Sequence, residues 1–141
     1  ETFIRFKSNF HFIISAGGVV QNINKEVLMI YKNDIWDLPK GKLEIHENLK
    51  YTAIREVKEE TNVKNLEIIS DYFSTYHMYS FCSKIILKET KWFLMKANKK
   101  NQLIPQLEEG IVLVDWISLN DIKDIKTYDS IYSVLKFFLK Y

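Results

Sequence analysis

Stretches of apolar residues predict five β-strands along the chain. Each stretch is rich in Ile, Val, Leu or aromatic residues, which favour strands, and ends at polar or glycine residues. Only a short polar turn separates the first two stretches, so we expect these two strands to form a hairpin. The strand patterns cover residues 10–20, 26–31, 66–79, 84–97 and 111–117.

The spacing of apolar residues becomes helical in two places. Over residues 48–61, Leu49, Ala53 and Val57 recur every four residues among charged positions, which predicts an amphipathic helix. Residues 131–139 repeat this spacing and predict a second helix near the C-terminus. Strands with one helix in the middle and one at the end indicate an α/β fold, in which a mixed β-sheet lies between helices.

Composition and net charge narrow the possible functions. The 141 residues are the usual length of one domain, and a content of 47% hydrophobic and 14% aromatic residues excludes a disordered chain. The net charge of +2 is too small for a protein that coats nucleic acid or binds a membrane surface. We therefore expect no DNA or membrane partner, and any anion binding should be local.

Cysteine content and apolar runs indicate a cytoplasmic protein. Cys82 is the single cysteine, so the chain forms no internal disulfide, and no Cys and His spacing resembles a zinc site. The longest apolar run, residues 12–20, is too short to span a membrane. Residues 1–7 lack the basic start and the apolar run of a signal peptide, so we expect none.

Three glutamates on the middle helix are the clearest indication of chemistry. Glu56, Glu59 and Glu60 span about 100° of the helix circumference, so their carboxylates project toward one region. Carboxylates crowded in this way repel each other, which is typical either of a solvated acidic surface or of a site for a hard cation. Oxygen ligands select Mg²⁺, Mn²⁺ or Ca²⁺, and Mg²⁺ typically bridges carboxylates to substrate phosphates.

The loop before this helix favours the metal site over the solvated surface. In residues 37–41, Pro39 fixes the chain and Gly41 allows unusual backbone angles, so the loop can approach the helix and direct a carbonyl at a metal. Lys40 and Lys42 are placed to meet phosphate.

Arg55 is the second feature that favours a functional site on this helix over a solvated surface. It is one of two arginines in the chain, and its planar guanidinium can hold two carboxylates at fixed angles. We expect it to orient Glu47 and Glu56 rather than to be a simple surface residue.

The segment from Gly41 to Val63 resembles the Nudix box, the loop-helix-loop signature of the Nudix hydrolases, which act on a nucleoside diphosphate linked to another group. The resemblance implies a single Nudix domain over residues 1–141, built as an α/β/α sandwich. Asn62 stands where the family usually has glycine, and asparagine also tolerates a left-handed backbone. The matching positions are Gly41, Glu47, Arg55, Glu56, Val57, Glu59, Glu60 and Val63.

The resemblance also implies roles for individual residues. Glu59 and Glu60 would bind a divalent metal ion, Mg²⁺ or Mn²⁺. Glu56 would be a further ligand or the general base, and Lys40 would contribute its backbone carbonyl to the metal.

Family members often recruit another glutamate from a loop ahead of a late strand. The candidates here are Glu108 and Glu109, of which we prefer Glu109. The general base differs among family members, so it stays open among Glu56, Glu59 and Glu109. The implied reaction is in-line attack of a metal-activated water on a phosphorus atom of a P–O–P linkage.

The loop of residues 36–41 resembles the version found in diadenosine-polyphosphate and diphosphoinositol-polyphosphate hydrolases. We therefore expect a small nucleotide or polyphosphate as the substrate. In the predicted strand 66–79, Tyr76 and His77 face opposite sides of the sheet. A base would stack on Tyr76 or Tyr79 while His77 touches phosphate, unless these rings are ordinary sheet residues.

Two other functions stay open. One is a non-catalytic, nucleotide-binding regulatory module of the same fold, although the complete glutamate set favours an enzyme. The other is removal of pyrophosphate from RNA 5′ ends, but the weak net charge argues against long RNA. The protein is a monomer or a homodimer, and the helical spacing favours packing of residues 137–139 on the sheet rather than on a second subunit.

Overall fold

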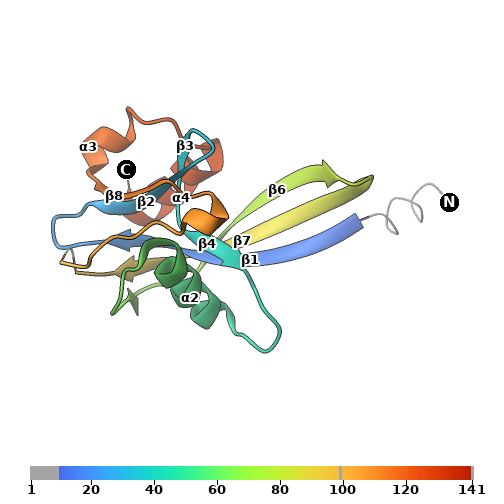
Figure 1. Ribbon diagram of the computed structural model, residues 1–141, viewed down its shortest axis with the longest axis horizontal. Coiled ribbons are helices and arrows are strands. Elements are labelled where there is room, and N and C mark those ends of the chain that lie inside the picture. Colours follow the sequence, from blue (N-terminus) through green and yellow to red (C-terminus); the bar gives the residue numbers. More distant parts are fainter. Residues whose placement is uncertain (1–9, 99, 141) are drawn as a thin grey trace.

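The computed structural model describes residues 10–98 and 100–140, and Figure 1 shows their arrangement. In this part of the chain, eight strands form one mixed sheet with helices on both sides. The strands are β1 (Phe10–Gln21), β2 (Val27–Lys32), β3 (Ile35–Asp37), β4 (Lys40–Lys42), β5 (Glu67–Ile68), β6 (Phe73–Phe81), β7 (Lys84–Lys96) and β8 (Leu113–Ile117). The helices are α2 (Leu49–Thr61), α3 (Leu119–Ile122) and α4 (Asp129–Leu139), with a short 3₁₀ helix, η1, over Leu107–Glu109.

Strand β1 lies in the middle of the sheet. It pairs in parallel with β7 along its whole length, from Phe10 opposite Ile85 to Gln21 opposite Lys96. The predicted hairpin of β1 and β2 is only partly right, because the turn joins the two strands but their pairing is confined to Gln21 and Val27. β2 pairs mainly with β3 and β8, while β1 uses its backbone groups for β7 and β4.

The prediction of one strand over residues 66–79 is wrong. This stretch divides into β5 and β6, which both pair with β7, and residues 69–72 between them are not in a strand. The side-chain oxygen of Ser70 accepts the backbone N–H of Leu94 at 3.0 Å, so a side chain takes the place of a neighbouring strand at this point. Strands β3 and β4 and helix α3 are too short to produce a periodic pattern, and the sequence does not predict them.

Two hydrophobic cores lie on opposite faces of the sheet, as strand alternation requires. Val19 of β1 belongs to the core that Leu135 of α4 covers, and the next residue, Val20, belongs to the core that Val57 of α2 covers. Phe138 packs against the first of these cores, so the C-terminal segment packs on the sheet as predicted. The α/β/α arrangement with a mixed sheet is therefore confirmed (Figure 1). No helix within the described residues is both long and apolar enough to cross a membrane.

Helix α2 begins and ends at asparagines that satisfy its terminal backbone groups. The Asn48 side chain accepts the backbone N–H of Tyr51 at 2.8 Å and caps the first turn. At the other end, Asn62 has a left-handed φ of 67°, and its N–H donates to the Lys58 carbonyl at 2.8 Å. Asparagine therefore serves where a glycine is usual, as the sequence predicts.

Candidate active site

Strand β4 places Gly41 directly against helix α2. β4 pairs with β1, which sets Gly41 opposite Ala16. A Cβ atom at Gly41 would stand 2.0 Å from the carboxyl carbon of Glu56 and 2.1 Å from its Oε2. Only glycine therefore allows this approach, and the Glu56 carboxylate lies on the β4 backbone.

Glu60 is a buried carboxylate that faces the same loop. Only 7% of its surface is exposed, and its Oε1 accepts the backbone N–H of Lys40 at 2.9 Å. Burial raises the pKa of Glu60 to about 7, although the charge and the N–H of Lys40 oppose the shift. A buried carboxylate of this kind gains from a cation placed beside it.

Arg55 joins the carboxylates of the loop and the helix. Its Nε and Nη2 donate to the two carboxylate oxygens of Glu47 at 2.6 and 2.9 Å. Its Nη1 donates to Glu56 at 2.8 Å and to Glu59 at 3.2 Å. The Arg55 guanidinium, through these hydrogen bonds, holds the pKa of Glu47 far below its usual range, at about 2. The expected contacts with Glu47 and Glu56 are present, and Nη2 also reaches the Lys42 carbonyl at 3.2 Å.

Glu109 lies close enough to Glu56 for its charge to raise the pKa of the Glu56 carboxyl group. Burial raises the pKa of Glu56, and Arg55 opposes this shift, while the charges of Glu59 and Glu109 add to it. Glu109 sits in η1, which ends at Gly110 with a left-handed φ of 82°. The structure thus brings the preferred loop glutamate toward the carboxylates of α2.

The carboxylates of Glu56, Glu59 and Glu60 are oxygen ligands that fit a hard divalent metal ion, although the three side chains do not converge on one point. Within residues 10–98 and 100–140, no three acidic, histidine or cysteine side chains form a ready ligand set. Arg55 bonds both Glu56 and Glu59, so these two carboxylates turn toward its guanidinium. The contacts to Glu59 are long and its side chain is 44% exposed, which leaves it free to turn. Oxygen donors on one helix face, with buried Glu60 among them, suit Mg²⁺ or Mn²⁺.

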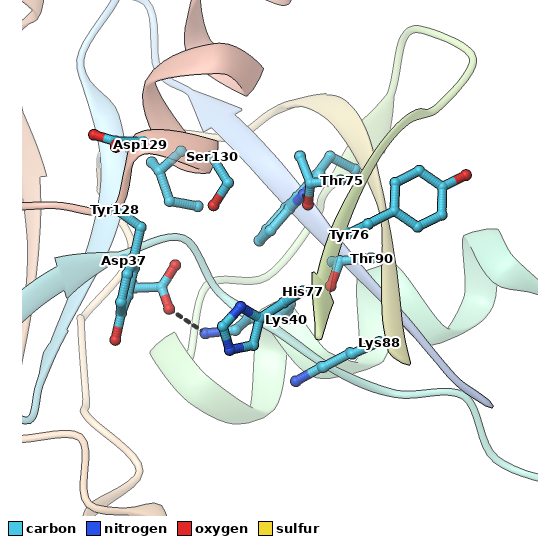
Figure 2. Close-up of a pocket in the computed structure, with 12 residues that line it drawn as sticks. Asp37, Lys40, Thr75, Tyr76, His77, Lys88, Thr90, Tyr128, Asp129 and Ser130 are labelled. Carbon is cyan, nitrogen blue, oxygen red and sulfur yellow. Dashed lines mark hydrogen bonds and ion pairs between the residues drawn. The ribbon is translucent and has the colours of Figure 1, made fainter. Parts of the chain in front are cut away.

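A pocket of about 470 Å³ opens beside these carboxylates, and Figure 2 shows the side chains that line it. Its walls come from Asp37 at the end of β3, from Lys40 at the start of β4, from β6 and β7, and from the start of α4. Lys40 links the pocket to the carboxylates, because its side chain lines the pocket while its N–H binds Glu60. The Lys40 ammonium forms an ion pair with Asp37.

Cationic side chains gather in this pocket. Lys88 of β7 lies opposite His77 of β6, and both side chains extend into the space beside Lys40 (Figure 2). Burial lowers the pKa of Lys88, and the nearby charge of Lys40 lowers it further. Lys40 and Lys88 can attract an anionic ligand such as phosphate, although Asp37 and Asp129 also line the pocket and balance their charges.

The side chains of Tyr76 and Lys42 do not extend into the pocket, unlike those of Lys40 and His77. Tyr76 is among the residues that line the pocket, but its ring points away from it (Figure 2), and its hydroxyl lies 3.2 Å from Oε2 of Glu89 on the opposite face of the sheet. His77 stacks instead with Tyr79, with ring centroids 5.4 Å apart, so the predicted alternation of faces is confirmed. The Lys42 side chain is exposed and does not line the pocket. Substrate binding by either residue stays a prediction.

Sequence reasoning does not single out Lys88 or Tyr128, which both line the pocket. Alternation along β7 offers a signal for Lys88, because it shares a face with Thr90 and Trp92. Nothing local marks Tyr128, since it joins the pocket only through the long-range packing of α4 near β6.

The fold and the site together define a class of protein. Clustered carboxylates that suit a divalent metal, next to a lysine-lined pocket, are typical of hydrolases that cleave phosphate linkages. Residues 11–137 match the NUDIX domain, so this chain belongs to the Nudix family and is a pyrophosphohydrolase of the Nudix type.

Several known proteins are similar to this chain. An RNA pyrophosphohydrolase of Pelagibacter ubique is 30% identical over 128 residues, which covers 78% of each chain. An 8-oxo-dGTP diphosphatase of Buchnera aphidicola is 32% identical over 94 residues, or 66% of this chain and 63% of the relative. Among solved structures, an Ap4A hydrolase of C. elegans in a binary complex superposes with a TM-score of 0.73 at 26% identity, covering 89% of this chain and 94% of that one.

Proposed function

We propose that this protein hydrolyses a P–O–P linkage in a dinucleoside polyphosphate, using a divalent metal held by carboxylates of α2. The observation that carries the proposal is the position of Lys40, whose N–H binds the buried Glu60 while its side chain lines the pocket. A polyphosphate bound in this pocket would therefore lie next to the residue whose backbone contacts Glu60.

Glu56, Glu59 and Glu60 would hold the metal, with the Lys40 carbonyl and Glu109 as further ligands. When bound, Mg²⁺ or Mn²⁺ lowers the pKa of the attacking water and neutralises charge on the phosphate oxygens. Arg55 would keep Glu56 in place, since it anchors the helix to the loop through a two-pronged contact with Glu47.

The pocket would hold the phosphate chain through the side chains of Lys40, Lys88 and His77. These groups come from three different elements and surround one space, so they can contact successive phosphates. Tyr128, on the opposite wall, offers an aromatic surface to one nucleoside.

The reaction itself needs a nucleophile, a proton acceptor and a leaving group. Water attacks one phosphorus atom in line with the bridging oxygen, the new P–O bond forms as the bridging P–O bond breaks, and two phosphorylated products leave. The proton of the water passes to a glutamate among Glu56, Glu59 and Glu109. The charge that develops on the leaving phosphate is balanced by the lysines of the pocket.

A second candidate is the removal of pyrophosphate from RNA 5′ ends. It is favoured by the similarity to the Pelagibacter ubique RNA pyrophosphohydrolase, which extends over 78% of both chains. The 5′ triphosphate of RNA presents the same anionic chain to the pocket. The two substrates differ in the group attached to the phosphate chain. In a dinucleoside polyphosphate this group is a second nucleoside, and in the RNA it is a polynucleotide.

A substrate panel separates these functions. The protein, with Mg²⁺ or Mn²⁺, is incubated with a dinucleoside tetraphosphate, NTPs, a nucleotide sugar, a diphosphoinositol phosphate and a triphosphorylated RNA oligonucleotide. We expect the highest kcat/KM for the dinucleoside tetraphosphate and no cleavage in EDTA. A higher kcat/KM for the RNA would establish the second candidate, and tight binding without any cleavage would establish a regulatory module.

A further inference from the structure

Strand β6 borders an extension of the sheet that reaches beyond the two cores. The start of β1, the end of β6 and the start of β7 form this extension together, away from α2, whereas the start of β6 packs near α4 through Phe73 and Phe137 (Figure 1). β6 pairs with β7 from Phe73, opposite Trp92, to Phe81, opposite Lys84, and has no second strand partner among the described residues. Its outer edge therefore presents backbone N–H and C=O groups that another strand can bind.

β6 has no charged residues, in contrast to the other edge strands of this sheet. Natural edge strands usually carry charged residues, which discourage pairing with another chain. Every other strand with a single strand partner in the described sheet follows this rule, whereas the nine residues of β6 include no Asp, Glu, Lys or Arg. The guarding charges are Asp37 in β3, Lys40 and Lys42 in β4, Glu67 in β5 and Asp115 in β8.

The extension also exposes apolar side chains next to this edge. Phe12, Leu87 and Met78 form a row across the three strands, because Leu87 pairs with both of the others. Met78 is 57% exposed, and Phe81 at the end of β6 is 63% exposed. A partner strand beside β6 would extend this apolar row and cover part of it.

The sequence of β6 is nearly symmetric about its centre. Read outward from His77, the flanking residues are Tyr76 and Met78, then Thr75 and Tyr79, then two serines, then two phenylalanines. An antiparallel pair of identical strands centred on His77 therefore sets similar residues opposite each other on both faces. A surface that matches itself in this way is what a two-fold dimer requires.

We propose that the protein forms a two-fold dimer through antiparallel pairing of β6 with β6 of a second copy. In this arrangement the sheets of the two copies become continuous. The row of Phe12, Leu87 and Met78 then continues into Tyr76 of the partner subunit. The β6 edge, which has no strand partner in the part of the chain that the structure describes, and its lack of charged residues carry this inference, which does not depend on the catalytic proposal.

Sedimentation velocity over a concentration series tests the dimer. We expect a monomer–dimer equilibrium for the wild type and a monomer for Met78→Lys, because the two new lysines lie diagonally across the axis and repel. Leu113→Lys is the matched control, since Leu113 is 52% exposed in the edge strand β8, and it should dimerise like the wild type. Mixing Met78→Lys with Met78→Glu should restore dimers.

Disulfide formation tests the register. In a Cys82→Ser background, His77→Cys should cross-link under mild oxidation, because residue 77 faces its own copy across the axis. Ser80→Cys should not, because residue 80 lies about six residues along the strand from its own copy, or roughly 20 Å. A wild type that stays monomeric at every concentration would overturn the proposal, as would a dimer that Met78→Lys leaves intact. Cross-linking through Ser80→Cys alone would overturn the register.

Discussion

The α-carbon of Gly41 faces the Glu56 carboxylate so closely that a Cβ atom there would lie 2.0 Å from the carboxyl carbon. The contact joins β4 to α2 and places Glu56 where its Oε1 also receives the Arg55 hydrogen bond at 2.8 Å. The position of Glu56 therefore depends on the absence of a side chain at residue 41.

Gly41→Ala should abolish most activity while leaving the protein folded. The added methyl group must displace the Glu56 side chain, and a misplacement of about 1 Å in a catalytic group costs on the order of 100-fold in rate. Overpacking of this kind costs roughly 1–3 kcal/mol in stability. Turnover and thermal unfolding of the variant give both quantities, and a fully active Gly41→Ala enzyme would mean that Glu56 has no catalytic role.

Glu60→Gln should stabilise the metal-free protein at alkaline pH. Because burial raises the pKa of Glu60 from 4.5 to about 7, the folded state keeps a proton that the unfolded chain releases. Stability therefore falls as the pH rises from about 4.5 through 7, by up to about 3 kcal/mol for a shift of this size. A glutamine side chain does not ionise, so it avoids the free-energy cost of burying a charged carboxylate. In EDTA at pH 8 the variant should therefore unfold at a higher temperature than the wild type. A metal-induced rise in unfolding temperature should be smaller in the variant.

The Glu47 carboxylate should make the protein sensitive to acid. Arg55 lowers the pKa of Glu47 to about 2, so the stabilisation from this pair is complete above the unfolded pKa of 4.5 and is lost as the pH falls toward 2. Denaturant melts between pH 5 and pH 2 should show a shallower loss of stability for Glu47→Gln than for the wild type. Parallel curves for the two proteins would show that the ion pair contributes nothing.

Lys88→Gln should weaken substrate binding more than it slows the chemical step. Lys88 is half-buried in the pocket near Lys40, and a hydrogen bond from a charged group contributes about 1.5–3 kcal/mol. We expect KM for a dinucleoside tetraphosphate to rise roughly 10- to 100-fold. Lys84→Gln is the control, because Lys84 is an exposed lysine in the same strand and outside the pocket. Equal KM values for the two variants would remove Lys88 from the binding site.

The sequence predicts the contacts of Arg55 with Glu47 and Glu56 well because its information there is local. Glu56, Glu59 and Glu60 share a helix face by their spacing alone, and the fork geometry of Arg55 predicts its contacts with Glu47 and Glu56. These contacts form within a short stretch of chain, where periodicity decides which side chains meet.

The pocket side of the site cannot be predicted in this way. Lys88 and Tyr128 line one pocket because α4 packs near β6, which pairs with β7, and no local pattern joins residues so far apart in the chain. The same reason explains the hairpin error, since β1 takes β7 as its main partner. The break near Ser70 depends on one side-chain hydrogen bond to Leu94, which apolar periodicity does not reveal.

The most direct test of the account is the Mg²⁺-dependent rate of dinucleoside tetraphosphate cleavage by the wild type, by Glu59→Gln and by an exposed control, Glu67→Gln. Circular dichroism confirms that each protein is folded. The account predicts that Glu59→Gln loses activity by orders of magnitude while Glu67→Gln keeps the wild-type rate. If Glu59→Gln cleaves the substrate as fast as the wild type, the carboxylates of α2 do not carry the reaction.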